Sequence, residues 1–460
     1  MLHCSPQPQN RPHVVHSEKT DVLWLVEHVA RELDVACAVK AIADHKYGLN
    51  VEIRNIYQHI KDYLVEFEPK VVVHPYVYKV KGALATEDVF ERWPNAIHVN
   101  AAWEQIHYRA NKIIKSPSDD IAKNGVIHFA WGDFYRDYLL LHGVPAEKII
   151  VTGHPAYQLY REPYRRVFRD RAELGRRYGL DTNKQWIFVP ENYRWAFAQK
   201  KIDFFVSLGG ERAELMALID FSIPSLKSLL GACLEVSKGN NVEVIFRPRP
   251  AVHTSRILKF FKSEVGKDTG NVKFIKEGSV REWILASDQV VSSYSTSLLE
   301  ASVAGKPAWM YEPLPIPDSL HCDWYDYAPR LKTPEDFVRI CNDSGPDRRG
   351  TLLADWAHRN LVPGPDPIEL IAAELNNLCG RTVTGYSVGT LPKDLMEKEY
   401  FNKDSHEMDS FSPTEVRDLS TRWARHLYGV AIAPHGEGKN GTKKSIVPDP
   451  QGDKFLAGKG

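Results

Sequence analysis

A run of hydroxyl side chains followed by a glutamate is the part of this sequence whose residue types point most directly to chemistry. It lies between a short apolar run at residues 289–291 and a segment with the composition of a short helix that ends at Gly305. Hydroxyl groups and the free backbone N–H groups at a helix start donate hydrogen bonds to phosphate, and a carboxylate accepts them from ribose hydroxyls. The candidate nucleotide- and phosphate-binding residues of this run are Ser292, Ser293, Ser295, Thr296, Ser297 and Glu300.

The same run has an explanation that needs no ligand. Ser297 and Glu300 have the spacing of a capping box, in which each side chain bonds to a free backbone N–H of the first helical turn. Both roles stay open on the pattern alone. The four hydroxyls that precede the cap favour the ligand.

Two arginines and two further polar residues end other apolar runs in the same half of the chain. The guanidinium groups of Arg247 and Arg249 would bind phosphate bidentately and stabilise a departing nucleotide. Glu191 and Asn192 are candidates for contacts with the base or sugar of the same nucleotide. Solvated loop arginines and an ordinary polar turn after a strand are the alternatives.

Candidate catalytic residues lie in the N-terminal half. Group transfer onto a hydroxyl needs a general base, or a carboxylate nucleophile when it proceeds by double displacement. We predict Glu104 for this role, then Glu27, with His74 as a further candidate. A structural role is the alternative for each, and the sequence does not choose between the two mechanisms. Because the chain has neither an Asp-x-Asp pair at a strand end nor an HExxH motif, we expect chemistry without a metal.

Alternating apolar runs and helical segments must position these residues. They occur in two series separated by Gly153-His154-Pro155, which predicts an α/β fold with two Rossmann-type parallel sheets facing across a cleft. Ligands bind beyond the carboxyl ends of such strands. The expected units are a loose lead-in at 1–20, an N-terminal domain at 21–155, a C-terminal nucleotide-binding domain at 156–365, a helical extension at 366–433 and a disordered tail at 434–460.

The composition excludes several classes of function. Lys+Arg and Asp+Glu both number 59 among the 460 residues, so no net charge recruits nucleic acid. The six cysteines lack CxxC or zinc-ligand spacing, which is typical of reduced thiols in the cytosol. We see neither a signal peptide nor an uncharged apolar segment of membrane-spanning length, and we expect a soluble cytoplasmic protein.

Several segments resemble one family. The pattern S-S-x-S-T-S-x-x-E-A-x-x-x-G-K-P at 292–307 resembles the nucleotide-binding segment of GT-B glycosyltransferases. The stretch G-V-P-x-x-K-I-x-V-T-G-H-P at 143–155 is similar to the GT-B crossover, which UDP-sugar 2-epimerases also have. V-E-H-V-A-R-E-L-D at 26–34 and W-E-Q at 103–105 resemble bacterial proteins of capsule and lipopolysaccharide biosynthesis. The resemblance covers residues 21–315.

The resemblance implies a metal-independent glycosyltransferase of bacterial surface polysaccharide biosynthesis. Its N-terminal domain would bind the glycan or glycolipid acceptor and catalyse transfer. The donor would be a CMP-Kdo-like, UDP- or GDP-sugar, bound as substrate with no other cofactor. Peripheral contact with the cytoplasmic face of a membrane is compatible with such an acceptor. Arg249 stands where these transferases often have a histidine, which leaves the phosphate-contacting residue open.

Two alternatives remain. A nucleotide-sugar 2-epimerase has the same fold, but we find no D-S-G-G-x-x-E-E-type segment where that family has one. A non-catalytic GT-B-like module that binds polysaccharide or partners would keep the fold and lose nucleotide affinity.

Overall fold

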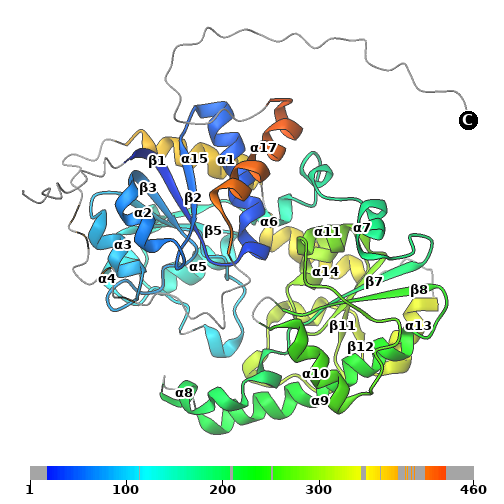
Figure 1. Cartoon of the computed structure of the whole chain (residues 1–460). Coiled ribbons are helices and arrows are strands. Elements are labelled where there is room, and N and C mark those ends of the chain that lie inside the picture. The colour runs from blue at the N-terminus through cyan, green and yellow to red at the C-terminus, as the bar shows by residue number, and fades with distance from the viewer. Residues whose placement is uncertain are drawn as a thin grey trace, which may run out of the picture.

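The computed structural model describes residues 18–112, 114–207, 211–249, 252–342, 349–362, 364–381 and 410–430, together with 389, 391, 395 and 398. The part of the expected lead-in before residue 18 and the expected tail at 434–460 lie outside these residues. Residues 18–20 belong to the first strand. The chain forms two α/β halves, the first blue to cyan and the second green to yellow in Figure 1.

The first half is built on a six-stranded parallel sheet in the order β2-β1-β3-β4-β5-β6. Consecutive residues from Val22 to Val26 are buried, as expected for a parallel strand covered on both faces. Its helices are α1 (Val29–Tyr47), α2 (Ile60–Glu66), α3 (Thr86–Arg92), α4 (Asp120–Asn124) and α5 (Asp133–Leu141). Its strands are β1 (Glu18–Val26), β2 (Val51–Asn55), β3 (Phe67–His74), β4 (Ile97–Asn100), β5 (Val126–Ala130) and β6 (Ile149–Val151).

The second half repeats this plan with a six-stranded parallel sheet in the order β12-β11-β10-β7-β8-β9. Its strands are β7 (Gln185–Pro190), β8 (Val242–Arg247), β9 (Lys273–Phe274), β10 (Gln289–Ser292), β11 (Ala308–Tyr311) and β12 (Arg330–Leu331). Its helices are α7 (Arg171–Tyr178), α8 (Ile202–Ser207), α9 (Arg212–Val236), α10 (Thr254–Glu264), α11 (Val280–Ala286), α12 (Ser297–Val303), α13 (Pro334–Asn342) and α14 (Arg349–Leu361). The predicted α/β fold with two Rossmann-type domains is thus confirmed.

The helix α9 has the length and composition to cross a membrane, the one such helix in the described part of the chain. Its most apolar window has a mean hydropathy of 1.4, and 56% of that window is buried in the fold. The helix contains Pro224 and packs against α13 and β8. This packing is that of a core helix.

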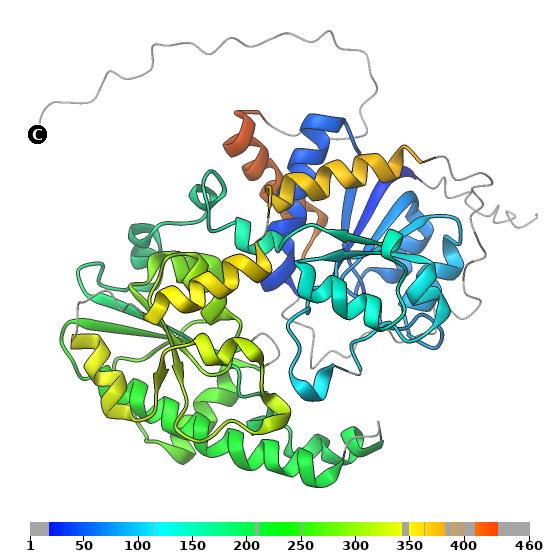
Figure 2. The ribbon, with the colours of Figure 1, turned by 180° about the vertical axis from the view of Figure 1, so that it is seen from behind.

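The chain crosses between the halves twice. It leaves the first through α6 (Pro155–Gln158) and returns after α14, and the two passages are joined by a hydrogen bond of 2.6 Å from His154 N to Leu361 O. The helices that follow, α15 (Pro367–Cys379) and α17 (Pro413–Tyr428), pack on α1, as Figures 1 and 2 show. Because they cover α1, its residues from Glu32 to Ala43 are buried.

A second contact joins the halves away from these passages. The 3-10 turn at Arg109–Asn111 meets the turn at Asp318–Leu320, where Arg109 forms an ion pair with Asp318. The thiol of Cys322 donates to the carbonyl of His107 at 3.1 Å. The aromatic and acidic segment after β11 therefore closes one end of the space between the sheets.

Candidate functional site

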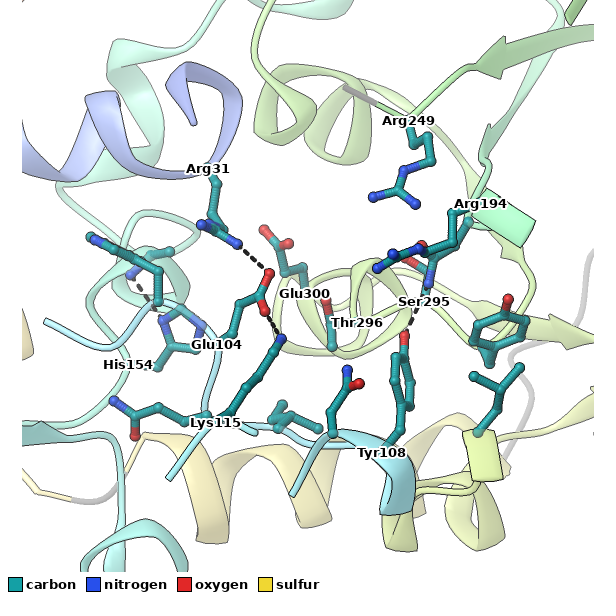
Figure 3. A pocket seen from close by; sticks show the side chains of 18 of the residues that line it. Arg31, Glu104, Tyr108, Lys115, His154, Arg194, Arg249, Ser295, Thr296 and Glu300 are labelled. Carbon is teal, nitrogen blue, oxygen red and sulfur yellow. Dashed lines mark hydrogen bonds and ion pairs between the residues drawn. The ribbon is translucent and has the colours of Figure 1, made fainter. Parts of the chain in front are cut away.

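A cavity of about 270 Å³ lies between the halves and takes its lining from both. Figure 3 shows Arg31, Glu104 and Lys115 of the first half facing Arg194 and Arg249 of the second. The loops after β4, β7, β8 and β10 all reach it, as expected for a ligand site at the carboxyl ends of parallel strands. Its charged lining residues are Arg31, Glu104, Lys115, Arg194, Arg249, Arg281 and Glu300.

Two arginines of the second half enter the cavity, and neither forms an ion pair among the described residues. Arg194 follows β7 and Arg249 follows β8, and the buried Nε of Arg249 has no hydrogen-bond partner. Desolvation, and then the charge of Arg249, lowers the pKa of Arg194. Like charges gathered in this way are costly unless an anion joins them. This pair forms the most evident anion site of the cavity.

Arg247 does not share this position. It is the last residue of β8, and its guanidinium donates to the carbonyls of Glu277 at 3.1 Å and Gly278 at 2.8 Å. Burial lowers its pKa to about 10. It lines a different cavity, of about 330 Å³, together with Asp34 and residues of α17. Of the two predicted arginines, the structure brings only Arg249 to the interdomain cavity.

The serine-rich turn is divided in the same way. Ser292 is still in β10 and donates to the carbonyl of Pro190, and Ser293 is buried, so neither lines the cavity. Ser295 and Thr296 do line it. Ser297 is the first residue of α12, and its backbone N–H donates to Ser295 Oγ at 3.3 Å.

The capping box that the sequence permits is not formed. The N-cap of α12 is Thr296, without a side-chain capping bond, and Glu300 points into the cavity. One oxygen of Glu300, Oε2, accepts a hydrogen bond of 2.6 Å from Tyr160 on the crossover. Burial raises the pKa of Glu300, against the opposing charge of Arg281 and the hydrogen bond from Tyr160. Glu300 is therefore available to a ligand rather than engaged in a cap.

Arg281 joins the two halves beside this glutamate. It lies on α11, is 1% exposed and donates to Asp34 Oδ2 at 3.1 Å and to the carbonyl of Arg31 at 2.8 Å. Ser279 donates to the same Asp34 oxygen at 2.7 Å. Desolvation opposes the charge of Arg281, but Asp34 and Glu300 outweigh it and raise its pKa. No local pattern in the sequence indicates Arg281 as a site residue, because a lone arginine in a short helix is normally solvated.

Glu104 is held between two cations of the first half. Arg31 Nη1 lies 2.9 Å from Glu104 Oε1, and Lys115 forms an ion pair with the other oxygen, as Figure 3 shows. The Glu104 side chain is 43% exposed. Burial, and then the charges of Arg31 and Arg194, lowers the pKa of Lys115 to about 8. Glu104 is thus an accessible carboxylate in a fixed position opposite the anion site.

Glu27 and His74, the other predicted catalytic residues, lie elsewhere. Glu27 lines an adjoining cavity of about 210 Å³, which shares Arg31, Trp103 and Glu104 with the larger one. His74 is fully buried at the end of β3, with its Nε2 2.9 Å from Nδ1 of His98. His74 is the last residue of β3, so its side chain still packs in the core of the sheet and does not reach the cavity.

Glu191 and Asn192 have different surroundings. Glu191 is buried and accepts hydrogen bonds from the backbone N–H groups of Tyr193 and, at 3.3 Å, Arg249. Burial raises the pKa of Glu191, against the charge of Arg249 and these two hydrogen bonds. Asn192 lines the cavity and donates to the hydroxyl of Tyr108 at 3.2 Å. Glu191 therefore supports the loop that carries Arg249, while Asn192 can meet a ligand.

Aromatic rings form much of the remaining wall. His154 is stacked between Trp131, at a ring distance of 3.6 Å, and Tyr157, at 3.9 Å. Burial, and then the charges of Arg281 and Arg31, lowers its pKa, so the ring is neutral. Flat apolar faces beside cations suit a nucleobase and sugar rings. The other aromatic residues that line the cavity are Trp103, Tyr108, Trp195 and Tyr294.

The described residues contain no group of three His, Cys, Asp or Glu side chains placed to hold a metal ion. The cationic side chains that line the cavity can neutralise a phosphate.

No protein-family model and no curated protein sequence matches the chain. Its fold is shared with a UDP-GlcNAc 2-epimerase of Methanocaldococcus jannaschii in complex with UDP-GlcNAc and UDP, at 12% identity and a TM-score of 0.50, over 78% of this chain and 100% of that chain. The fold is GT-B-like. The wall teichoic acid polymerase TagF (12% identity, TM-score 0.47, covering 78% and 88%) and Anabaena HepE with UDP-glucose (11%, 0.41, covering 77% and 98%) also match. Identities this low show the fold alone.

Proposed function

We propose that this chain is a glycosyltransferase that binds a nucleotide sugar in the interdomain cavity and transfers the sugar to a hydroxyl of a glycan or glycolipid. One observation carries the proposal. Two arginines that form no ion pair among the described residues face an accessible carboxylate of the other domain across one aromatic-lined cavity. An anion site and a base in this arrangement are what transfer from an activated phosphate ester requires.

The second domain supplies the donor contacts. Arg194 and Arg249 bind the phosphates, and the carboxylate of Glu300 accepts hydrogen bonds from the ribose. Ser295 and Thr296 lie between these groups and donate to the phosphate nearest the ribose. Two guanidinium groups match either the diphosphate of a UDP- or GDP-sugar or the phosphate and sugar carboxylate of a CMP-Kdo-like donor.

The first domain supplies the chemistry on the acceptor. Glu104 takes the proton of the acceptor hydroxyl as its oxygen forms a bond to the anomeric carbon of the donor sugar. The bond from that carbon to the phosphate oxygen breaks, and the oxygen leaves with the electron pair. Arg194 and Arg249 stabilise the negative charge that develops there, a role that needs no metal.

The class of acceptor and the cellular location are part of the same proposal. The segments at 26–34 and 103–105 support a bacterial surface polysaccharide as the acceptor. We therefore propose a cytoplasmic location with peripheral contact at the membrane where such acceptors are extended.

Nucleotide binding is the first test. Thermal shift and calorimetry with CMP, CDP, UDP, GDP and their sugars should give one preferred nucleotide, and Arg249→Met should bind it more weakly. The preferred nucleotide sugar is then incubated with and without glycan acceptors, and the products are separated. A product that needs the acceptor supports transfer. A C2-epimerised donor formed without acceptor shows an epimerase, and no response to any nucleotide shows a binding module.

A further inference from the structure

The crossover between the domains contributes a tyrosine to the proposed ribose site. Tyr160 follows α6, is 3% exposed, and donates its hydroxyl hydrogen to Glu300 Oε2 at 2.6 Å. Burial, and then the negative charge on Glu300, oppose ionisation of this phenol and raise its pKa well above the usual value. Tyr160 therefore acts as a donor and fixes one oxygen of the carboxylate.

The rest of the Glu300 carboxylate is open to the cavity. Its other oxygen, Oε1, accepts no hydrogen bond from the described residues, and Arg281 acts on it through charge alone. A carboxylate has about four acceptor positions, so two ribose hydroxyls can bind while Tyr160 stays in place. The tyrosine thus holds the acceptor in one orientation before the ligand arrives.

A second tyrosine on the same crossover shows what a purely structural bond of this type looks like. Tyr164 donates to Asp366 Oδ2 at 2.7 Å and is also buried. That oxygen accepts from Gln158 as well, and the other caps the first turn of α15 through two backbone N–H groups. Asp366 is thus satisfied by the protein and lies outside the cavity, whereas Glu300 is left with an unused oxygen inside it.

From this contrast we infer that Tyr160 is a positioning residue for ribose recognition, which presents the Glu300 carboxylate to the 2′- and 3′-hydroxyls of the donor nucleotide. The inference rests on the proposed function. It adds that the segment linking the domains determines selectivity for ribonucleotides over deoxyribonucleotides.

The test compares wild type, Tyr160→Phe and the matched control Tyr164→Phe in the full chain. Dissociation constants are measured by calorimetry for CMP, CDP, GDP and UDP and for the 2′-deoxy and 3′-deoxy forms of each. Wild type should prefer the ribonucleotide by about tenfold or more, as expected when a hydrogen bond to a charged group is lost. In Tyr160→Phe this preference should fall to within about threefold, with little change in the affinity for the deoxy forms.

Tyr164→Phe loses a comparable hydrogen bond and should lower the melting temperature to a similar extent, while its preference for ribose stays at the wild-type value. If Tyr160→Phe also keeps the wild-type preference, the inference is wrong and the proposed function stands. If none of the nucleotides binds wild type, both are wrong. A loss of affinity that is equal for ribose and deoxyribose forms would assign Tyr160 a structural role only.

Discussion

The exchange of Arg249 and of Arg247 for methionine separates nucleotide binding from fold stability at the end of β8. The residues are two positions apart, yet Arg249 enters the interdomain cavity and Arg247 donates to the carbonyls of Glu277 and Gly278. Methionine keeps the apolar stem of arginine and removes its charge and donors. Arg249→Met should therefore weaken nucleotide binding, and Arg247→Met should weaken the fold.

The size of the first effect follows from the surroundings of Arg249. It has no ion pair among the described residues, its Nε is buried without a hydrogen-bond partner, and the one carboxylate that its charge acts on, Glu191, is buried and bonded to backbone N–H groups, so a phosphate in the cavity can satisfy the guanidinium. A unit charge pair at about 4 Å interacts by about 4 kcal/mol at an effective dielectric constant of about 20. Desolvation of the phosphate offsets part of this, which leaves about 1.5–3 kcal/mol, or about a 10- to 150-fold rise in Kd.

The second effect has a different origin. Arg247→Met leaves the carbonyl of Gly278 without its donor and that of Glu277 with the indole N–H of Trp283 alone, at a cost of about 1–3 kcal/mol of unfolding free energy. No atom of Arg247 lines the interdomain cavity, so nucleotide affinity should stay within about twofold of wild type.

Calorimetry with the preferred nucleotide and urea unfolding of both variants measure the two effects side by side. The assignment of the anion site to Arg249 would be refuted if Arg249→Met bound the nucleotide with the wild-type Kd. It would also be refuted if Arg247→Met raised the Kd as much as Arg249→Met does. Unfolding also shows whether Arg249→Met is intact, since Glu191 keeps its two backbone hydrogen bonds in that variant.

Three further predictions concern the base, the core and the domain contact. Glu104→Gln should lower the turnover number for transfer by about 10²- to 10⁴-fold, measured at saturating donor, with the nucleotide Kd within about threefold. Burial lowers the pKa of His128 to about 4. Because the unfolded chain binds the proton first as pH falls, the contribution of neutral His128 to the free energy of unfolding is complete above about pH 6.5 and is lost at about 1.4 kcal/mol per pH unit down to about pH 4. In urea unfolding measured over this pH range, His128→Gln should make the free energy of unfolding depend less on pH. A Cβ on Gly132 would collide with the carbonyl of Asn360, whereas one on Gly231 meets nothing within 4 Å, so Gly132→Ala should lower the unfolding free energy by about 1–3 kcal/mol and Gly231→Ala should not.

Local patterns in the sequence were sufficient for the architecture and for part of the site. Apolar runs followed by polar residues mark the carboxyl ends of parallel strands, and these ends share one edge of a sheet. Glu104, Asn192, Arg249 and Glu300 reach the cavity for this reason. Each lies beyond the last residue of its strand, where the side chain is released from the packing of the sheet.

The roles of residues at the very end of a strand were harder to predict. Ser292, Arg247 and His74 are the last residues of β10, β8 and β3, and their side chains are used by the core rather than by the cavity. A shift of one or two residues in the predicted end of a strand is enough to change the role of a side chain. Arg281 was missed for another reason, since its partners lie on α1, about 250 positions away in the sequence.

Glu300 shows where local reasoning reaches its limit. Ser297 and Glu300 satisfy the pattern of a capping box and equally that of a ligand site, and no residue within the segment decides between them. The deciding partner is Tyr160, 140 positions earlier in the chain, whose hydroxyl holds the carboxylate toward the cavity and away from the helix start. Since that tyrosine is on the crossover, the orientation of the glutamate depends on the packing of the two domains. A site of this kind can be proposed from sequence, but its geometry is a property of the assembled fold.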